Sequence, residues 1–432
     1  MLFFKKTAYA IAVAASVCAF SACGGDDEEG GVTPPAPIPT PDPVTDVLSA
    51  EDAKEYVENT ASDFLALFNA NDQKAVANLA DYVAENYGDL GLPDIFGDED
   101  DYALAPKNFT GSLAQAVRTH SFNPISRAAY VYDYSFSDFT GVYEPGRYNW
   151  EKTADSNDLI FRFRGPAGNC ELKVSASGNS CTIEDYDEDY DETIRVTIPR
   201  NVKITLTEGS TMHADINVVN ELNINGHSFY VNVDATLANL GVALEGRGSD
   251  SQITETQSLS INGTTYQTST ATLNGRGMLN PDTYEYLDED DISAVLSNSS
   301  AAVNIMGNIE VRGQVKNVGA IVNAAENTCF DNWDGVSKDE ALNLCRAACN
   351  TINNNIAGEV YFGGNSAVQA TVIFQPSIDD EGYYWYVDAV PVIKYAADGS
   401  TQSFEDALDG FNLGKLERQW ESVINSYRRL FR

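Results

Sequence analysis

Residues 222–230 read LNINGHSFY, and residues 259–266 read LSINGTTY. In both stretches an Asn-Gly dipeptide separates two runs in which polar and apolar residues alternate. Asn-Gly between alternating runs is the strongest short-range signal of a β-hairpin, because both residues tolerate positive φ. A similar segment follows each copy, DATL at 234–237 and TATL at 270–273. The two copies predict consecutive long hairpins of one meander, since a solenoid needs about three repeats or more.

The period-two pattern extends from about residue 128 to residue 277. Further runs rich in β-branched and aromatic residues predict strands at 130–136, 159–163, 194–198 and 202–206, the last two separated by Pro199. Thr, Ser and Asn dominate one side of the alternation, so one sheet face is expected to remain in water. Residues 368–374 and 383–395 flank the turn 379–382 and predict another hairpin.

Helical spacing appears on both sides of the strand-rich region. Ser49 begins a capping box ahead of an amphipathic segment, and a second helix is predicted to end at Tyr87. Ser337 and Glu340 form another capping box and predict a short helix, and an apolar stripe over 413–431 predicts a last one. The expected fold class is α+β: a large curved antiparallel β-sheet, a meander with long hairpins, with amphipathic helices at both chain ends packed on one face.

The first residues have the layout of a secretory signal. Lys5 and Lys6 precede an apolar run of about ten residues, too short to span a bilayer as a helix. The run ends in Phe20-Ser21-Ala22-Cys23, which resembles the lipobox of bacterial lipoproteins, with Phe20 where such boxes usually carry Leu. The resemblance implies cleavage before Cys23 and acyl chains on its thiol and new amine. An ordinary signal peptide with an incidental Cys is the alternative.

Residues 24–31, GGDDEEGG, form an acidic run directly after Cys23. The run resembles the export signal of surface lipoproteins in Bacteroidota, in which acidic residues after the lipidated Cys mark delivery to the outer surface. The resemblance implies a protein anchored by lipid in the outer membrane and facing the cell exterior. A solvated acidic spacer is the alternative. The likeness covers only about the first thirty residues.

The sequence divides into four segments. A signal peptide at 1–22 precedes the anchor, acidic run and Pro-rich stalk at 23–47, in which repeated prolines favour extended polyproline II. An N-terminal helical segment at 48–127 and a β-rich body with a C-terminal helix at 128–432 are expected to fold as one unit. The net charge of −37 repels phosphate backbones, so nucleic acid is not an expected partner.

Five Cys remain after Cys18 leaves with the signal and Cys23 takes lipid. Disulfides are the default expectation in an exported protein. The turn-like Ser177-Gly178-Asn179 between Cys170 and Cys181 favours that pair, and Cys329 would join Cys345 or Cys349. A metal site at the last three is disfavoured because no His lies near them in the sequence.

No catalytic motif is apparent in the sequence. It contains no Gly-x-Ser-x-Gly, His-Glu-x-x-His or P-loop, and His213 and His227 are more simply surface or paired side chains than general bases. Asp185, Asp187 and Asp189 alternate as Ca²⁺ ligands can, although Tyr190 stands where an EF-hand loop would have Gly, so a solvated acidic loop is the stronger interpretation. No other cofactor and no catalytic residue are expected.

The run Tyr383-Tyr384-Trp385-Tyr386 lies in a predicted strand. Tyr383 and Trp385 would share one side of that strand and could stack on a sugar ring, unless both sides are packed. The sequence therefore favours a non-enzymatic surface lipoprotein that binds a ligand, such as a glycan, or an envelope protein through its sheet. The alternatives are a lipid carrier with a cavity between sheet and helices, and an extracellular hydrolase with paired carboxylates.

Overall fold

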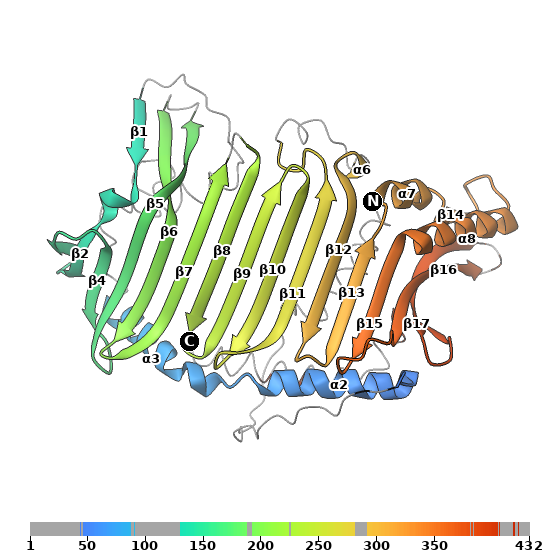
Figure 1. Ribbon diagram of the computed structural model, residues 1–432, viewed down its shortest axis with the longest axis horizontal. Helices are drawn as coiled ribbons and strands as arrows, with labels where there is room; N and C mark the ends of the chain where they lie inside the picture. Colours follow the sequence, from blue (N-terminus) through green and yellow to red (C-terminus); the bar gives the residue numbers. More distant parts are fainter. Residues whose placement is uncertain are drawn as a thin grey trace. The chain divides into compact units, whose positions relative to one another are not determined.

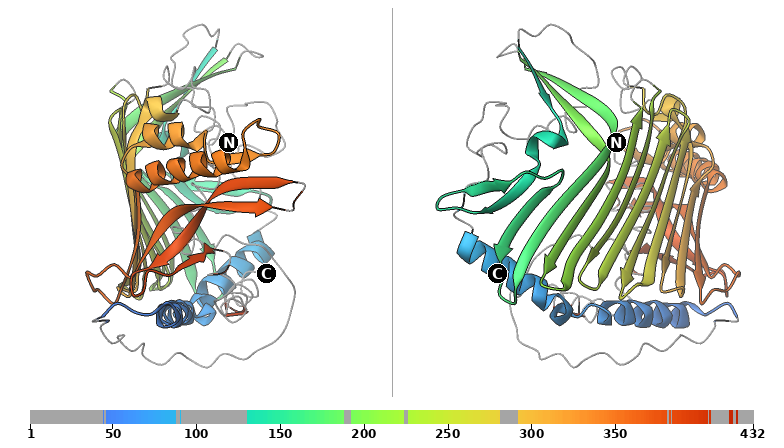
Figure 2. Two further views of the ribbon diagram at one scale, coloured as in Figure 1. Left: turned by 90° about the vertical axis from the view of Figure 1, so that its right-hand side faces the viewer. Right: turned by 60° about the vertical axis from the view of Figure 1, so that its left-hand side comes forward.

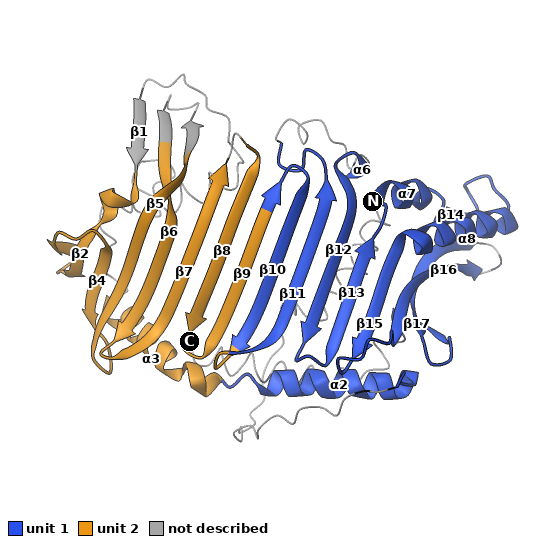
Figure 3. Ribbon diagram, in the orientation of Figure 1, with its two compact units in different colours: residues 1–69, 248–260, 264–425 blue, residues 70–247, 261–263, 426–432 orange. Residues whose placement is uncertain are grey.

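The structure is a computed structural model that describes residues 44, 46–87, 90, 130–187, 192–223, 226–280, 292–380, 382, 384–404, 406, 418–419 and 422. It confirms the α+β class: curved antiparallel sheet predominates, accompanied by a few helices (Figure 1). The predicted C-terminal helix lies outside the described residues apart from isolated positions. By contacts the chain forms two compact units (Figure 3). Unit 1 comprises residues 1–69, 248–260 and 264–425, and unit 2 comprises residues 70–247, 261–263 and 426–432.

Unit 2 begins with one short and one longer helix and continues as strands. Its elements are η1 (Ala70–Gln73), α3 (Lys74–Tyr87), β1 (Tyr130–Tyr134), η3 (Phe136–Phe139), β2 (Gly141–Pro145), β3 (Trp150–Ala154), β4 (Leu159–Arg164), β5 (Asn169–Asp187), β6 (Glu192–Glu208), β7 (Thr211–Asn223), β8 (Ser228–Leu237) and most of β9 (Leu240–Ser249). β4 to β8 pair in chain order, each antiparallel to the next, whereas β1 pairs parallel with β6 and β2 parallel with β4. This is the predicted meander.

The predicted break between two strands at Pro199 is wrong, because β6 runs through it. Pro199 pairs with Asn179 on β5, next to a shift in register between Asn179 and Cys181. Proline has no N–H to give to a ladder and is tolerated where the ladder is already irregular. Gly178, at φ +69°, precedes the irregularity and supplies the unusual backbone conformation.

Unit 1 contains the remaining strands and the two longest of the described helices. Its elements are α2 (Ala50–Ala66), β10 (Gln252–Ile261), β11 (Thr264–Gly275), α6 (Ile292–Val295), β12 (Leu296–Ile305), β13 (Ile309–Val315), α7 (Val318–Ala325), β14 (Cys329–Asp331), α8 (Lys338–Asn355), β15 (Ile356–Phe362), β16 (Ala370–Asp380), β17 (Trp385–Tyr395) and β18 (Thr401–Ser403). Asn262 and Gly263, both at positive φ, form the two-residue turn between β10 and β11, as the Asn-Gly signal predicts.

The ladders of unit 1 separate a polar face from an apolar one. Thr268, Asn304, Glu310 and Tyr361 form one row across four neighbouring strands. Val303, Val311 and Val360 form a row on the opposite face. The guanidinium of Arg312 lies 4.4 Å from the centre of the Tyr361 ring and covers it. One face of this part of the sheet is therefore hydrophilic, as the alternation of Thr, Ser and Asn predicts.

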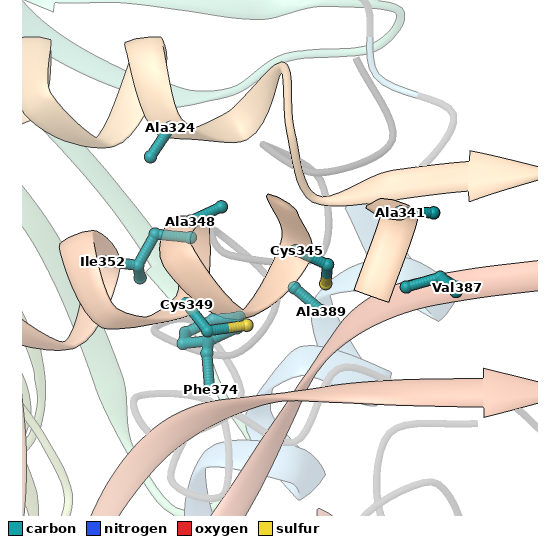
Figure 4. Close-up of a cluster of buried hydrophobic side chains, with 9 residues drawn as sticks. All are labelled: Ala324, Ala341, Cys345, Ala348, Cys349, Ile352, Phe374, Val387 and Ala389. Atoms are coloured by element: carbon teal, nitrogen blue, oxygen red, sulfur yellow. The ribbon is translucent and has the colours of Figure 1, made fainter. Parts of the chain in front are cut away.

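Helix α8 builds the main core of unit 1. The Ser337 side chain accepts a hydrogen bond from Glu340 N at 3.3 Å, which confirms the predicted N-cap, although the helix is long rather than short. The helix lies against β16 and β17 (Figure 2, left). The buried side chains between these elements belong to Ala324, Ala341, Cys345, Ala348, Cys349, Ile352, Phe374, Val387 and Ala389 (Figure 4). Because this core covers one face of β17, only the other face of that strand is free of contact with α8.

Candidate functional site

β17 has neighbours on both sides, β14 and β16. Tyr386 pairs with Asp331 on β14 and with Asp379 on β16. Directly opposed residues of an antiparallel ladder point to the same face. Adjacent strands lie about 4.8 Å apart, so the backbones of Asp331 and Asp379 stand roughly 10 Å apart on either side of Tyr386. This places an aromatic side chain between two carboxylates.

The next row inward on the same face carries Cys329, Asp388 and Ser377. The opposite face of β17 is the packed one, because Trp385 and Val387 contact the α8 core, as does Phe330 on β14. Side chains alternate along a strand, so Tyr386 faces away from α8, and Asp388 on the same face is buried in the next row. The chemistry of this end of unit 1 therefore lies on the face that α8 does not cover.

Trp333 lies in the turn that follows β14, and its side chain is 80% exposed. Asp331 Oδ1 accepts a hydrogen bond from Trp333 N at 2.6 Å, and Asp331 N donates to Asp334 Oδ2 at 2.8 Å. The turn is thus fixed by local hydrogen bonds while its indole remains in water. Burial of a Trp would remove a large apolar area from water, so an indole held open in an ordered turn points to a binding role.

Tyr384, 42% exposed, joins Trp333 at this end of the two strands. Trp333 lies two residues beyond Asp331, and Tyr384 lies two residues before Tyr386, the residue with which Asp331 pairs. The register therefore brings both exposed rings to one end of β14 and β17. We call Asp331, Trp333, Asp379, Tyr384 and Tyr386 together the aromatic patch.

The patch is negatively charged. Lys338 is the one Lys or Arg in residues 329–340 and 376–388. It forms an ion pair with Asp380, and this contact holds the pKa of the Asp380 carboxyl below its usual range. The Cys329 thiol donates a hydrogen bond to the Tyr386 hydroxyl at 2.8 Å. Burial of the Tyr386 side chain is the main cause that raises its pKa, and the hydrogen bond with the Cys329 thiol raises it further. The phenol therefore stays protonated. Flat aromatic rings beside carboxylate acceptors are suited to a ligand that has apolar faces and polar edges.

The two aromatic residues predicted to bind ligand do not form this site. Trp385 packs against the α8 core, which corrects its assignment to an open face, and Tyr383 lies outside the described residues. Sequence reasoning missed Trp333. Its signal was a Trp inside the turn-forming run Asp331 to Gly335 (DNWDG), where a large apolar residue has no local structural reason to stand.

The predicted Cys170–Cys181 disulfide is wrong. Both residues lie on β5, where the predicted turn between them is an irregularity within a continuous strand. At about 3.3 Å per residue they stand roughly 35 Å apart, far beyond the ~7 Å limit for a disulfide. Burial is the main cause that raises the pKa of the Cys170 thiol, and the nearby Glu208 carboxylate adds to it, so that the pKa reaches about 11.

The predicted bond from Cys329 to Cys345 or Cys349 is absent, because all five described cysteines are free in the structure. Phe330, not Cys329, faces α8, the helix that carries the other two thiols. Side chains that point to opposite faces of a strand cannot both reach the same partner without backbone movement. Cys329 is instead exposed beside Tyr386.

Asp185 and Asp187 lie on β5, opposite Ile194 and Glu192, whereas Asp189 is outside the described residues. In the described part of the chain no group of three or more His, Cys, Asp or Glu side chains is placed to hold a metal ion. The Ca²⁺ site therefore stays a prediction. Cys23 also lies outside the residues that the structure describes.

His213 is buried and its Nε2 lies 3.3 Å from Glu208 Oε2. The same carboxylate accepts hydrogen bonds from Ala167 N at 2.6 Å and Gly168 N at 3.1 Å, so this pair holds the turn before β5. His227 occupies a turn at φ +44°. In the described residues, no helix is both long enough and apolar enough to cross a membrane.

The segment that precedes α2 is docked at one end of unit 1. Val44 and Leu48 pack with Ala53 against Ile309 and Phe362. The buried Gln369 side chain binds the backbone of this segment, because Oε1 accepts from Leu48 N and Nε2 donates to Asp46 O. Residues 46–48, at the end of the predicted stalk, are therefore held beside the first residue of β16.

No family model matches the sequence, and no curated protein matches it. Among solved structures, the chain is similar to a porin-like protein from Bacteroides vulgatus ATCC 8482 at 11% sequence identity, over 60% of this chain and 87% of that chain. The TM-score of 0.14 is too low for this likeness to support a conclusion about fold or function.

Proposed function

We propose that the chain is a non-enzymatic, lipid-anchored lipoprotein of the cell surface that binds a glycan through the aromatic patch. The observation that carries the proposal is the exposed Trp333, held by Asp331 at the same end of β14 and β17 as Tyr384. Sugars present flat C–H faces that stack on aromatic rings and hydroxyl groups that donate to carboxylates. The patch offers both kinds of partner.

The position of residues 46–48, where the predicted stalk ends, supports this function. Gln369 binds the stalk end directly before β16 begins, and Asp379 and Asp380 lie where β16 ends. A strand of this length spans roughly 33 Å. The aromatic patch therefore lies at the end of the β16–β17 hairpin remote from the stalk, where a surface-anchored protein would meet a ligand from outside.

The lipid-carrier alternative finds no support where α8 meets β16 and β17. A carrier needs an apolar cavity between helix and sheet. Ile352, Phe374 and Val387 fill this interface, and each is buried.

The test is a glycan-binding screen on the full mature chain in detergent micelles, followed by titration of Trp333→Ala. The expected result is binding of at least one glycan class, with affinity reduced about tenfold or more by the substitution, equivalent to ~1.4 kcal/mol. Tyr148→Ala is the matched control, because Tyr148 is 71% exposed in unit 2 and should not affect binding. Absence of glycan binding, or equal losses in both variants, would contradict the proposal.

A further inference from the structure

We infer that the aromatic patch selects amino sugars, that is, glycans with a free, protonated amino group. This inference rests on the proposed function and specifies its ligand class. The geometry behind it is the row in which Tyr386 stands between the carboxylates of Asp331 and Asp379, with the exposed Trp333 and Tyr384 at the same strand ends.

The exposed end of the two segments that build the site, residues 329–340 and 376–388, carries more acidic than basic residues. Asp388 lies in the adjacent row but is buried, so it does not contribute to the surface that a ligand would meet. Lys338, the one cation in the two chain segments that build the site, already forms an ion pair with Asp380. An anionic glycan such as a polyuronate would meet a net negative charge here, whereas an ammonium group would gain opposite charge on both sides of Tyr386.

Aromatic rings add to the preference for a cation. The face of a Trp or Tyr ring carries negative electrostatic potential and attracts an ammonium group placed over it. A ring with carboxylates beside it therefore distinguishes an amino sugar from its N-acetylated form, which has the same stacking face but no charge. Next to Trp333, Asn332 Oδ1 is buried without a hydrogen-bond partner among the described residues, so the turn lacks a donor of the kind that an amine supplies.

The experiment compares four β-1,4-linked oligosaccharides of equal length on the full mature chain. They are built from glucosamine, N-acetylglucosamine, glucose and a uronic acid. The expected result is that the glucosamine oligomer binds at least tenfold more tightly than the N-acetylated and glucose oligomers, and that the uronic acid oligomer does not bind. The tenfold preference should shrink as salt concentration rises.

Asp379→Asn tests the carboxylate without threatening the fold, because Asp379 is an exposed residue near the end of β16. It should remove most of the preference for glucosamine while binding of the neutral oligomers persists. Asp155→Asn in unit 2 makes the same change in net charge at a fully exposed side chain and should leave the preference intact.

Three outcomes would overturn the inference. If the N-acetylated or glucose oligomer binds as tightly as glucosamine in a Trp333-dependent way, the ligand class is wrong although glycan binding stands. If Asp379→Asn and Asp155→Asn weaken glucosamine binding equally, the preference reflects overall charge and not the patch. If none of the four oligomers binds and the wider screen is also negative, the proposed function fails as well.

Discussion

The side chain of Gln369 accepts a hydrogen bond from the backbone N–H of Leu48 at 2.8 Å, although 321 residues separate the two in sequence. Gln369 is only 1% exposed, and its amide nitrogen donates to Asp46 O at 3.3 Å. The Gln369 amide both accepts from and donates to one backbone segment, so it makes the hydrogen bonds that a neighbouring β-strand would make. The contact fixes residues 46–48 of unit 1 directly ahead of α2.

Gln369→Ala should release this segment. The substitution leaves Leu48 N without its partner and opens a cavity, which should lower the free energy of unfolding by about 2 kcal/mol. Hydrogen exchange of residues 46–49 should accelerate more than that of α8. Gln257→Ala, at an exposed position on β10, is the control and should change stability by less than about 0.5 kcal/mol. Unchanged exchange at 46–49 would show that Gln369 does not hold the segment.

Ser337→Ala should destabilise α8. The hydroxyl accepts from Glu340 N, and loss of an N-cap typically costs about 1 kcal/mol. The measurement is chemical unfolding followed by circular dichroism. Ser297→Ala, at an exposed position on β12, should have little effect. Equal losses in the two variants would rule out a capping role.

Stability should depend on pH through Asp158. Its carboxylate lies 2.7 Å from Lys173 Nζ, and this contact lowers the pKa of Asp158 in the folded state. The ion pair therefore stabilises the fold above the unfolded pKa of about 3.9, and the stabilisation disappears as pH falls through the folded pKa. Asp158→Asn should cost ~0.5 kcal/mol at pH 7, since the pair is partly exposed.

At acidic pH, below the folded pKa of Asp158, the Asp158→Asn variant and the unsubstituted protein should unfold at the same urea concentration. A stability difference that persists undiminished there would mean that the substitution acts through packing and not through the charge.

Membrane attachment should depend on Cys23. Cys23→Ser should move the protein from the membrane fraction to the soluble envelope fraction, because one residue would carry the acyl chains. Cys18→Ser, inside the predicted signal peptide, should leave the attachment unchanged. Mass spectrometry of native protein should show an acylated N-terminus at Cys23. Retention of residues 1–22, or an unmodified Cys23, would refute the anchor.

Features that depend on a few neighbouring residues could be predicted from the sequence. Asn262-Gly263 specifies its own turn, and Ser337 and Glu340 specify the start of α8. The break at Pro199 and the Cys170–Cys181 bond were wrong for one physical reason. β5 and β6 remain paired over a long ladder that contains an irregularity at Asn179. The local residue preferences predicted a turn at this irregularity and a strand break at Pro199 opposite it.

The candidate site was predicted only in part. Trp385 and Tyr386 lie in β17 on opposite faces, as the alternation predicts, although the strand begins only at Trp385; the sequence does not tell which face α8 covers. That depends on the packing of Phe374 and Val387 against the helix. Trp333 was missed because its position at the same strand ends as Tyr384 follows from the pairing of β14 with β17, two segments far apart in the chain.

Hydrogen exchange with and without bound oligosaccharide tests most directly whether the ligand meets the aromatic patch. The oligosaccharide that binds most tightly in the screen is added to the full mature chain, and exchange is followed by mass spectrometry. New protection is predicted at residues 329–334 and 384–388, with none on β7 to β9. Protection on β7 to β9 without change at 329–334 and 384–388 would contradict the assignment of function to Trp333 and its neighbours.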